Sequence, residues 1–327
     1  MRRWISLALL LVLLLVTCRA MVGAETLAAQ SRSVSLRYKQ PLDEAVVEQV
    51  LQKSPGITFW AEETVSLTAA WHTAGATALY YTGDAWLVWG QPCRVGSMPG
   101  PLDTGGCAIS TALAWELFGS KEPVGLALED GQQSYIVRGV FESGDCLALL
   151  SRAVGAFTAA ELPVDEDTAQ DPMGWTSRQL QQAGLPTADW QLYPSLPAGL
   201  ARLLAWLPVI LAAGLLLAAL PGWARRWPVW AREGAVFGVL LAAALALPWL
   251  LGLWPQWLTP SRWSDFSWWS QTAGQLGEYF SAWLKVYPAG RDVAFKTGLL
   301  AQWGLAAVQT GLWEALRCSL QPKQKPN

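Results

Sequence analysis

The sequence is poor in charge and in the residues that most catalytic and metal sites need. Of its 327 residues, only 15% are charged, and a single one, His72, is a histidine. Soluble chains usually carry about 25% charged residues, so this deficit indicates a membrane protein. One histidine excludes metal sites built from several histidines. The formal net charge of -2 argues against nucleic acid as a partner, because nucleic-acid-binding surfaces are basic.

The chain also lacks paired cysteines. No CxxC motif occurs, which argues against a zinc site. The cysteines are Cys18, Cys93, Cys107, Cys146 and Cys318. The second, third and fourth fall in a part that we expect outside the membrane, where disulfides persist. The sequence is compatible with two alternatives for Cys93, Cys107 and Cys146. Either two of them form a disulfide and the third is a free thiol, or all three are small buried apolar residues.

Motifs for catalysis and nucleotide binding are missing as well. No GxxxxGK[ST] motif is present, so the chain does not bind ATP through a P-loop. Four acidic residues, Asp165, Glu166, Asp167 and Asp171, precede Pro172 without an accompanying base, nucleophile or glycine-rich cradle. We interpret them as a solvated loop or a weak calcium contact. We therefore expect no enzyme, no catalytic residue, no cofactor and no metal site, and we expect His72 to be structural.

Long apolar runs are what the sequence does contain. Arginines at 2 and 3 precede an apolar run over 4–16. A membrane-spanning helix needs about 20 residues, so this run is close in length to a signal-peptide core. The small residues at 22–24 form an acceptable cleavage site. Residues 1–24 are thus either a membrane anchor or a signal peptide, and both alternatives export the domain that comes after them.

Three further segments are predicted to cross the membrane, at 200–220, 235–254 and 296–316. The last one is interrupted by Gln302, Gln309 and Glu314. Unpaired polar groups are costly in lipid, so these three side chains should face other helices. The fold class predicted is therefore an α+β extracytoplasmic domain plus an α-helical membrane domain, with one N-terminal span or signal peptide and three C-terminal spans.

Basic residues set the orientation of the spans, because loops rich in arginine and lysine stay in the cytoplasm. The densest basic cluster in a short loop consists of Arg225, Arg226 and Arg232. We expect this loop and the tail at 317–327 inside the cell, and residues 31–193 outside. Residues 255–292 should also be external. The chain is then a multi-pass protein of the plasma membrane with its large domain extracytoplasmic.

The external segment at 255–292 is rich in aromatic residues at helical spacing. These apolar residues are Phe266, Trp269, Ala273, Leu276, Phe280 and Trp283. Ser264 is placed to cap such a helix. The pattern predicts an amphipathic helix at the outer face of the membrane, and the aromatic stripe is interpreted as packing against membrane or protein.

The most informative stretch runs from Asp103 to Glu142. It predicts a strand over 107–109, a helix that Ser110 caps and Gly119 ends, and a hairpin around Asp130-Gly131. The apolar face of the helix is formed by Leu113, Ala114, Leu117 and Phe118. The hairpin strands are Leu126–Leu128 and Tyr135–Phe141. The unit is strand, helix, hairpin, with a glycine at each corner.

This stretch resembles the periplasmic core domain of MacB/FtsX-type ABC transporter permeases. The family's helix of the form S-x-x-L-A-x-x-L-F-G matches 110–119, its V-G turn matches Val124-Gly125, and its strand V-x-G-V-F matches 137–141. The resemblance extends over about forty positions. The one-plus-three plan of spans matches the same family.

The remainder of the external domain is predicted with less distinctive patterns. Strands are expected at Val34–Tyr38, Ile57–Trp60, Val65–Trp71, Ala76–Tyr81 and Ala85–Trp89, and helices at Leu42–Gln52, Ala153–Glu161 and Thr176–Ala183. Leu147–Leu150 is predicted to be either a last strand or the start of a helix.

The resemblance implies a permease-like subunit of an ABC-type export or mechanotransmission system, with a separate ATPase subunit and a second permease subunit as partners. Two departures put coupling to an ATPase in question. The family's cytoplasmic segment before the first helix corresponds here to residues 1–3 only, and the loop at 223–233 has no obvious docking helix. The alternative is a membrane-anchored extracytoplasmic binding or scaffold protein that has lost the coupling.

Overall fold

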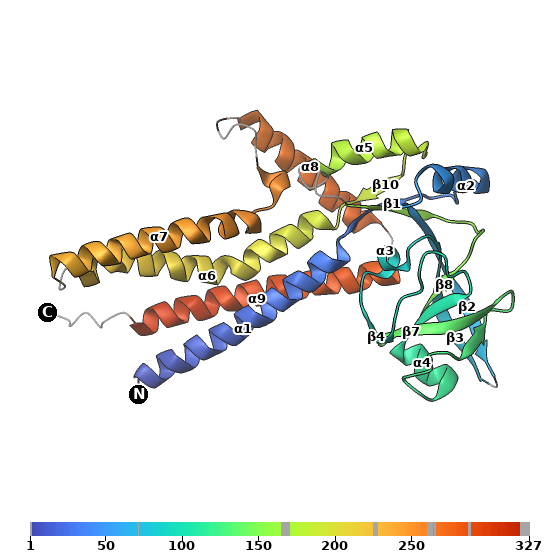
Figure 1. The fold of residues 1–327 in the computed structure, drawn as a ribbon, viewed down its shortest axis with the longest axis horizontal. Helices are drawn as coiled ribbons and strands as arrows, with labels where there is room; N and C mark the ends of the chain where they lie inside the picture. The colour runs from blue at the N-terminus through green and yellow to red at the C-terminus, as the bar shows by residue number, and fades with distance from the viewer. Residues whose placement is uncertain are drawn as a thin grey trace. The chain divides into compact units, whose positions relative to one another are not determined.

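The structure, a computed structural model, describes all residues except 1, 71, 165–170, 225–227, 260–263, 265, 287–288 and 321–327. The chain divides into two compact units (Figure 1). The helical unit consists of Met1–Ala28, Leu196–Leu258 and Lys296–Asn327. The sheet unit consists of Ala29–Ser195 and Thr259–Phe295.

The helical unit is formed mainly by four long helices of the described chain. They are α1 (Arg2–Gln30), α6 (Ser195–Ala224), α7 (Val229–Leu253) and α9 (Gly290–Leu320), and the short helix η2 (Gln256–Leu258) comes after α7. Among the described residues, two stretches are long and apolar enough to cross a membrane, Trp4–Gln30 and Val229–Pro248. The predicted spans at 200–220 and 296–316 lie on α6 and α9, and their crossing of the membrane stays a prediction.

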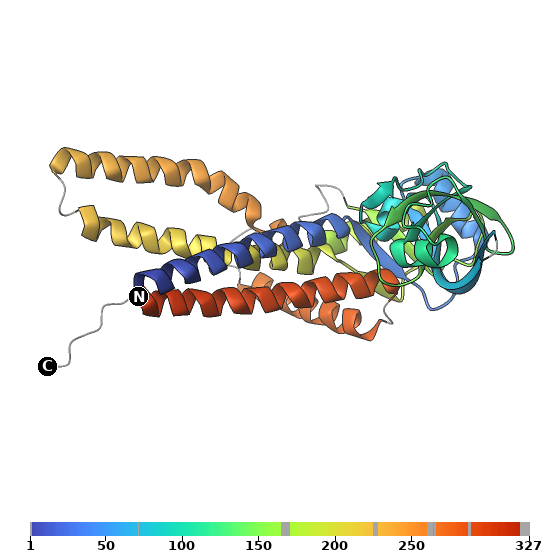
Figure 2. The same cartoon turned by 90° about the horizontal axis from the view of Figure 1, so that it is seen from below.

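Polar side chains on α9 face α1, as expected from the cost of burying them unpaired. Figure 2 shows the two helices lying side by side. The amide nitrogen of Gln302 donates to the carbonyl oxygen of Ala20, and that of Gln309 donates to the hydroxyl of Thr17 over 3.3 Å. Glu314 differs from the prediction, because it is exposed and pairs with Arg317 on its own helix.

A ten-stranded mixed sheet forms the centre of the other unit, in the order β10-β1-β9-β2-β3-β8-β5-β7-β4, with β6 beside β2 and β7. Its strands are β1 (Ser33–Arg37), β2 (Thr58–Ala69), β3 (His72–Thr82), β4 (Cys93–Gly96), β5 (Gly106–Ser110), β6 (Ala127–Glu129), β7 (Ser134–Phe141), β8 (Leu147–Ser151), β9 (Ala159–Pro163) and β10 (Trp190–Leu192). The helices of this unit are α2 (Glu44–Lys53), α3 (Ala85–Trp89), α4 (Thr111–Phe118), α5 (Pro172–Ala183) and α8 (Phe266–Lys285).

The predicted strand-helix-hairpin is confirmed. The hydroxyl of Ser110 accepts from the backbone N–H of Leu113 over 3.1 Å and caps α4. Gly119 ends the helix with φ +63°, a conformation that glycine adopts without strain. Leu113 and Leu117 are buried in the core, whereas Phe118 is only half-buried.

Two predicted elements are wrong. Residues Ala85–Trp89 form helix α3 instead of a strand: Asp84 accepts from the N–H of Trp86 over 2.9 Å and caps it, and Gly90 ends it with φ +63°. Ala153–Glu161 forms no helix, because strand β9 begins at Ala159 and pairs with both β1 and β2.

Other differences concern where the predicted strands and helices begin and end, and how many strands there are. The strands predicted at Ile57–Trp60 and Val65–Trp71 fall on one strand, β2, which pairs with β3 along nearly its whole length. Leu147–Leu150 is strand β8, and two more strands come after it. The helices predicted at Leu42–Gln52 and Thr176–Ala183 are confirmed as α2 and α5, with shifted ends.

The aromatic helix α8 belongs to the sheet unit. Tyr279 is 4% exposed and its ring lies 6.1 Å from that of Tyr193, beside β10. Trp269, Leu276, Phe280 and Trp283 are half-buried, whereas Phe266 is 82% exposed. Most of the stripe therefore packs on protein. A cap by Ser264 stays a prediction, since residue 265 lies outside the described residues.

Candidate functional site: buried charges where α9 begins

Glu161 is the centre of a charged network beneath the sheet unit's surface. It is fully buried in the middle of β9, between β1 and β2. Its carboxylate accepts from the hydroxyls of Ser33 and Ser35, both over 2.6 Å, and from the indole N–H of Trp60 over 2.9 Å. The two serines are alternate residues of β1, so they share one face. The guanidinium of Arg291 lies 2.8 Å from the same carboxylate.

A second ion pair lies next to the first. The guanidinium of Arg37, at the end of β1, donates to both carboxylate oxygens of Asp292, over 3.0 and 3.1 Å. The Arg37 guanidinium is also 4.2 Å from the centre of the Trp60 ring. Burial lowers the pKa of Arg37, and Asp292 opposes that shift. Arginine still stays charged, because its ordinary pKa is above 12.

Both ion pairs use consecutive residues of one helical turn, the first of α9. The Ala289 N–H donates to Asp292 over 3.2 Å, and the Gly290 N–H donates to the carboxylate of Glu62 on β2 over 2.8 Å. The first N–H groups of a helix have no partner within it, and carboxylates there are favoured by the helix dipole. The start of α9 is thus bound to β1, β2 and β9 by side chains from each strand.

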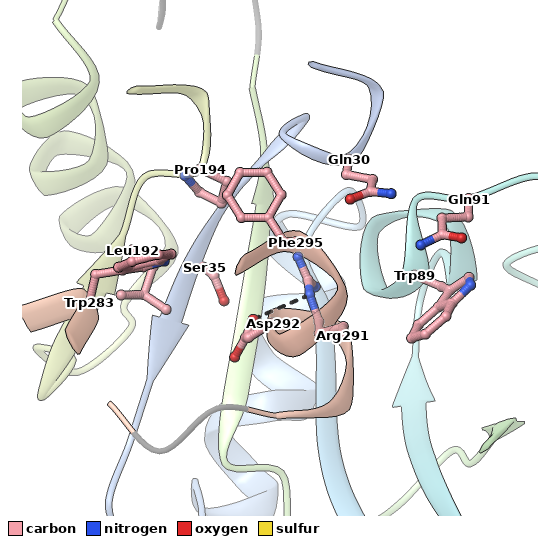
Figure 3. A pocket seen from close by; sticks show the side chains of 10 residues that line it. All are labelled: Gln30, Ser35, Trp89, Gln91, Leu192, Pro194, Trp283, Arg291, Asp292 and Phe295. Carbon is pink, nitrogen blue, oxygen red and sulfur yellow. Dashed lines mark ion pairs between the residues drawn. The ribbon is translucent and has the colours of Figure 1, made fainter. Parts of the chain in front are cut away.

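Figure 3 shows Ser35, Arg291 and Asp292 converging from β1 and α9, with Phe295 and Trp89 beside them. They line a cavity of about 30 Å³, room for about one water molecule. A groove of about 320 Å³ lies beside Arg37, Trp60 and Glu62. It is lined by Arg37, Tyr38, Trp60, Glu62, Thr158, Trp190, Val286 and Ala289.

This arrangement is suited to holding a helix rather than to chemistry. Every carboxylate in it takes part in hydrogen bonds or ion pairs, and the two hydroxyls next to the Glu161 carboxylate, those of Ser33 and Ser35, are buried. Removing one partner of a buried ion pair leaves an uncompensated charge, which costs roughly 3–5 kcal/mol. The network therefore penalises partial detachment of α9 from the sheet.

The residues singled out from the sequence lie elsewhere. Arg225 and Arg226 lie outside the described residues, and Arg232 is exposed on α7. The acidic residues at 165–167 also lie outside them, whereas Asp171 caps α5 by accepting from the Gly174 N–H over 3.0 Å. His72 is exposed at the start of β3. Within the described parts of the chain, no group of metal-ligating side chains comes together.

The five cysteines are free thiols in the structure. Cys107 is buried in the core, and burial raises the pKa of its thiol to about 12. Cys93 and Cys146 are half-buried. A disulfide among these three stays a prediction.

Sequence reasoning missed the network entirely. Its partners are far apart in the chain, with Ser33 and Glu161 separated by 128 positions and Arg37 and Asp292 by 255. One local signal was present: Arg291-Asp292 is an adjacent pair of opposite charges directly before an apolar run. If such charged side chains are buried, they need partners of opposite charge, because burying an unpaired charge is costly.

No protein-family model matches the chain, and no curated protein does. Solved structures do resemble it. The periplasmic region of MacB from Actinobacillus actinomycetemcomitans is 11% identical with a TM-score of 0.41, over 51% of this chain and 90% of that one. The extracellular domain of the noncanonic ABC-type transporter YknZ from Gram-positive bacteria is 15% identical with a TM-score of 0.36, over 47% and 97%.

A domain of a protein described as a permease from Porphyromonas gingivalis is 16% identical with a TM-score of 0.31, over 46% of this chain and 85% of that one. At these identities and scores, similarity alone assigns neither the fold nor the function. The chain is thus similar, over about half its length, to extracytoplasmic domains of ABC-type permeases.

Proposed function

We propose that this chain is a permease-like membrane subunit of an ABC-type export or mechanotransmission system, without an ATPase of its own. The observation that carries the proposal is the network at the start of α9. This helix is continuous from Gly290 to Leu320. Its first six residues belong to the sheet unit and the remainder to the helical unit. A displacement of α9 is therefore passed to the sheet through Arg291 and Asp292.

The other chain connections enter the same part of the sheet. Helix α1 ends at Gln30, three residues before β1 begins, and β10 ends at Leu192, three residues before α6 begins. Strands β10, β1 and β9 are neighbours. The three helices α1, α6 and α9 thus join the sheet at neighbouring strands, which supports a mechanical linkage between the helices and the sheet unit.

Helix α1 is a retained anchor in this proposal, not a cleaved signal peptide. Gln302 and Gln309 on α9 are 4% and 1% exposed, and their amide donors are bonded to Ala20 and Thr17 of α1. Cleavage after Ala24 would remove both partners and leave two buried amides unpaired. In lipid such groups are costly.

The topology proposed places residues 31–193 outside the cell and the loop at 225–232, with the C-terminal tail, inside. Single cysteines at positions 100 and 228, in a chain from which the native cysteines are removed, test this. We expect an impermeant maleimide to label position 100 on intact cells and position 228 only after permeabilisation. Intact-mass measurement should show residues 1–24 present. The reverse labelling pattern contradicts the topology, and a mature chain that begins at Glu25 contradicts the retained anchor.

The partners proposed are a separate ABC ATPase subunit and a second permease subunit, with the cytoplasmic contact at Arg225, Arg226 and Arg232. Exposed ion pairs are screened over about 8 Å at physiological salt, so this contact should weaken as salt rises. Lysine at all three positions keeps the charges that orient the spans but loses the bidentate geometry of arginine. We expect the triple-lysine variant to insert normally and to recover several-fold less ATPase on pull-down.

Mass spectrometry of the tagged wild-type protein purified from native membranes identifies the partners. An ABC ATPase and a second permease among them supports the proposal. If the wild type recovers no ATPase from correctly inserted protein, the function reverts to the alternative, a membrane-anchored extracytoplasmic binding or scaffold protein.

A further inference from the structure

The network at the start of α9 contains more acidic than basic side chains. Three carboxylates, those of Glu62, Glu161 and Asp292, face two guanidinium groups, those of Arg37 and Arg291. Glu161 is matched by Arg291, and Asp292 is matched by Arg37. Among the described residues, Glu62 has no cation in ion-pair contact, and its carboxylate accepts from the backbone N–H of Gly290.

We infer that docking of the start of α9 onto the sheet is linked to proton uptake, and that Glu62 is the group that binds the proton. A carboxyl group that is protonated can still accept from the Gly290 N–H through its carbonyl oxygen. Protonation therefore keeps the hydrogen bond that ties α9 to β2, while it removes the one charge in the cluster that no arginine balances.

The surroundings of Glu62 support this assignment. Arg37 approaches from β1, Glu161 lies on β9, and Arg291 and Asp292 come from α9. Tyr38 lines the same groove and is neutral, because burial raises the pKa of its phenol. Partial desolvation of its carboxyl in the groove likewise raises the pKa of Glu62, although the residue as a whole is exposed; Asp292 adds to the rise, and the Gly290 N–H and Arg37 oppose it. Glu62 remains exposed along the groove, so a proton from solvent can reach it.

The sign of the linkage follows from the direction of this shift. A carboxyl whose pKa is higher in the docked state than in the detached state binds protons more tightly when docked. Docking is therefore favoured as the pH falls through the raised pKa, and that advantage is lost as the pH rises above it. Acidification outside the cell should tighten the attachment of α9 and alkaline conditions should loosen it.

Hydrogen exchange of the full chain in lipid nanodiscs between pH 5 and pH 8, corrected for intrinsic rates, measures the attachment. In the wild type we expect protection of peptides covering 289–295 to fall as the pH rises, by up to about tenfold for each unit by which docking raises the pKa. Glu62→Gln carries no charge and keeps an acceptor for Gly290, so its protection should stay at the acid level throughout. Glu63→Gln, on the opposite face of β2, should behave as the wild type.

Three results overturn the inference: protection of 289–295 that does not depend on pH in the wild type, a pH dependence that survives in Glu62→Gln, or an equal pH dependence in peptides of the core at 107–118. The last result would show a global effect. If Glu62→Gln does not fold, Glu62→Asp provides the test. Its carboxyl still titrates but is shorter, so it should keep the pH dependence and show weaker protection at every pH.

Discussion

Replacing Glu161 with alanine should destabilise the sheet unit by roughly 3–5 kcal/mol, the cost of breaking a buried ion pair from one side. The change leaves the Arg291 guanidinium, whose side chain is 10% exposed, without its carboxylate. It also removes the acceptor for two serine hydroxyls and for the Trp60 indole. Urea titration of the full chain in detergent, with pulse proteolysis reporting on the sheet unit, measures the loss.

A double variant separates the cost of an uncompensated buried charge from the cost of changed side-chain packing. Glu161→Met with Arg291→Met removes both charges and should cost less than either single change, because apolar replacements of a buried pair are often neutral. Glu142→Ala is the matched control: it also removes a glutamate paired with an arginine, but its side chain is 70% exposed, and such pairs contribute about 0–1 kcal/mol. Equal losses for Glu161→Ala and Glu142→Ala would contradict the role given to the network.

Leu117→Ala should cost roughly 2–5 kcal/mol, the range for truncating a buried leucine. Its side chain is 1% exposed in the core formed by α4 and the adjacent strands. Trp115 is on the same helix and is 59% exposed, so Trp115→Ala should change stability by only about 0.5 kcal/mol. The same urea titration compares the two variants. A midpoint for Leu117→Ala that matches the one for Trp115→Ala would refute the packing of α4 against the sheet.

The parts of the fold that sequence predicted are those specified by neighbouring residues. Ser110 and Gly119 are close in the chain and determine the two ends of α4 by themselves. The wrong prediction at Ala85–Trp89 also has a local cause, an ambiguous apolar pattern. Five apolar residues fit a strand or a helical turn equally well, and the deciding residues were Asp84 and Gly90, which cap α3 at each end. Both capping residues are visible in the sequence, but the prediction of a strand at Ala85–Trp89 does not use them.

The network could not be predicted in the same way, because none of its pairs is local. Glu161 was placed at the end of a helix that does not exist, since its run of small residues carries no clear period. Only pairing of β9 between β1 and β2 brings Ser35 opposite Glu161. The arrival of Arg291 then depends on a segment much further along the chain. Sequence patterns report on the spacing of residues within one helix or strand, and they contain no information on contacts between residues that are far apart in the chain.

The division of the sheet unit into two stretches has a consequence for biosynthesis. Residues 196–258 separate Ala29–Ser195 from Thr259–Phe295. During synthesis the sheet strands emerge from the ribosome first. Arg291, the cation that pairs with Glu161, is added 130 positions later. Until then a carboxylate that is fully buried in the finished unit has no cation. The sheet unit therefore completes its folding only after α6 and α7 have been made. A chain whose synthesis stops before residue 291 would carry a sheet unit that lacks its buried ion pair, so the unit whose strands are made early is among the last parts of the chain to be completed.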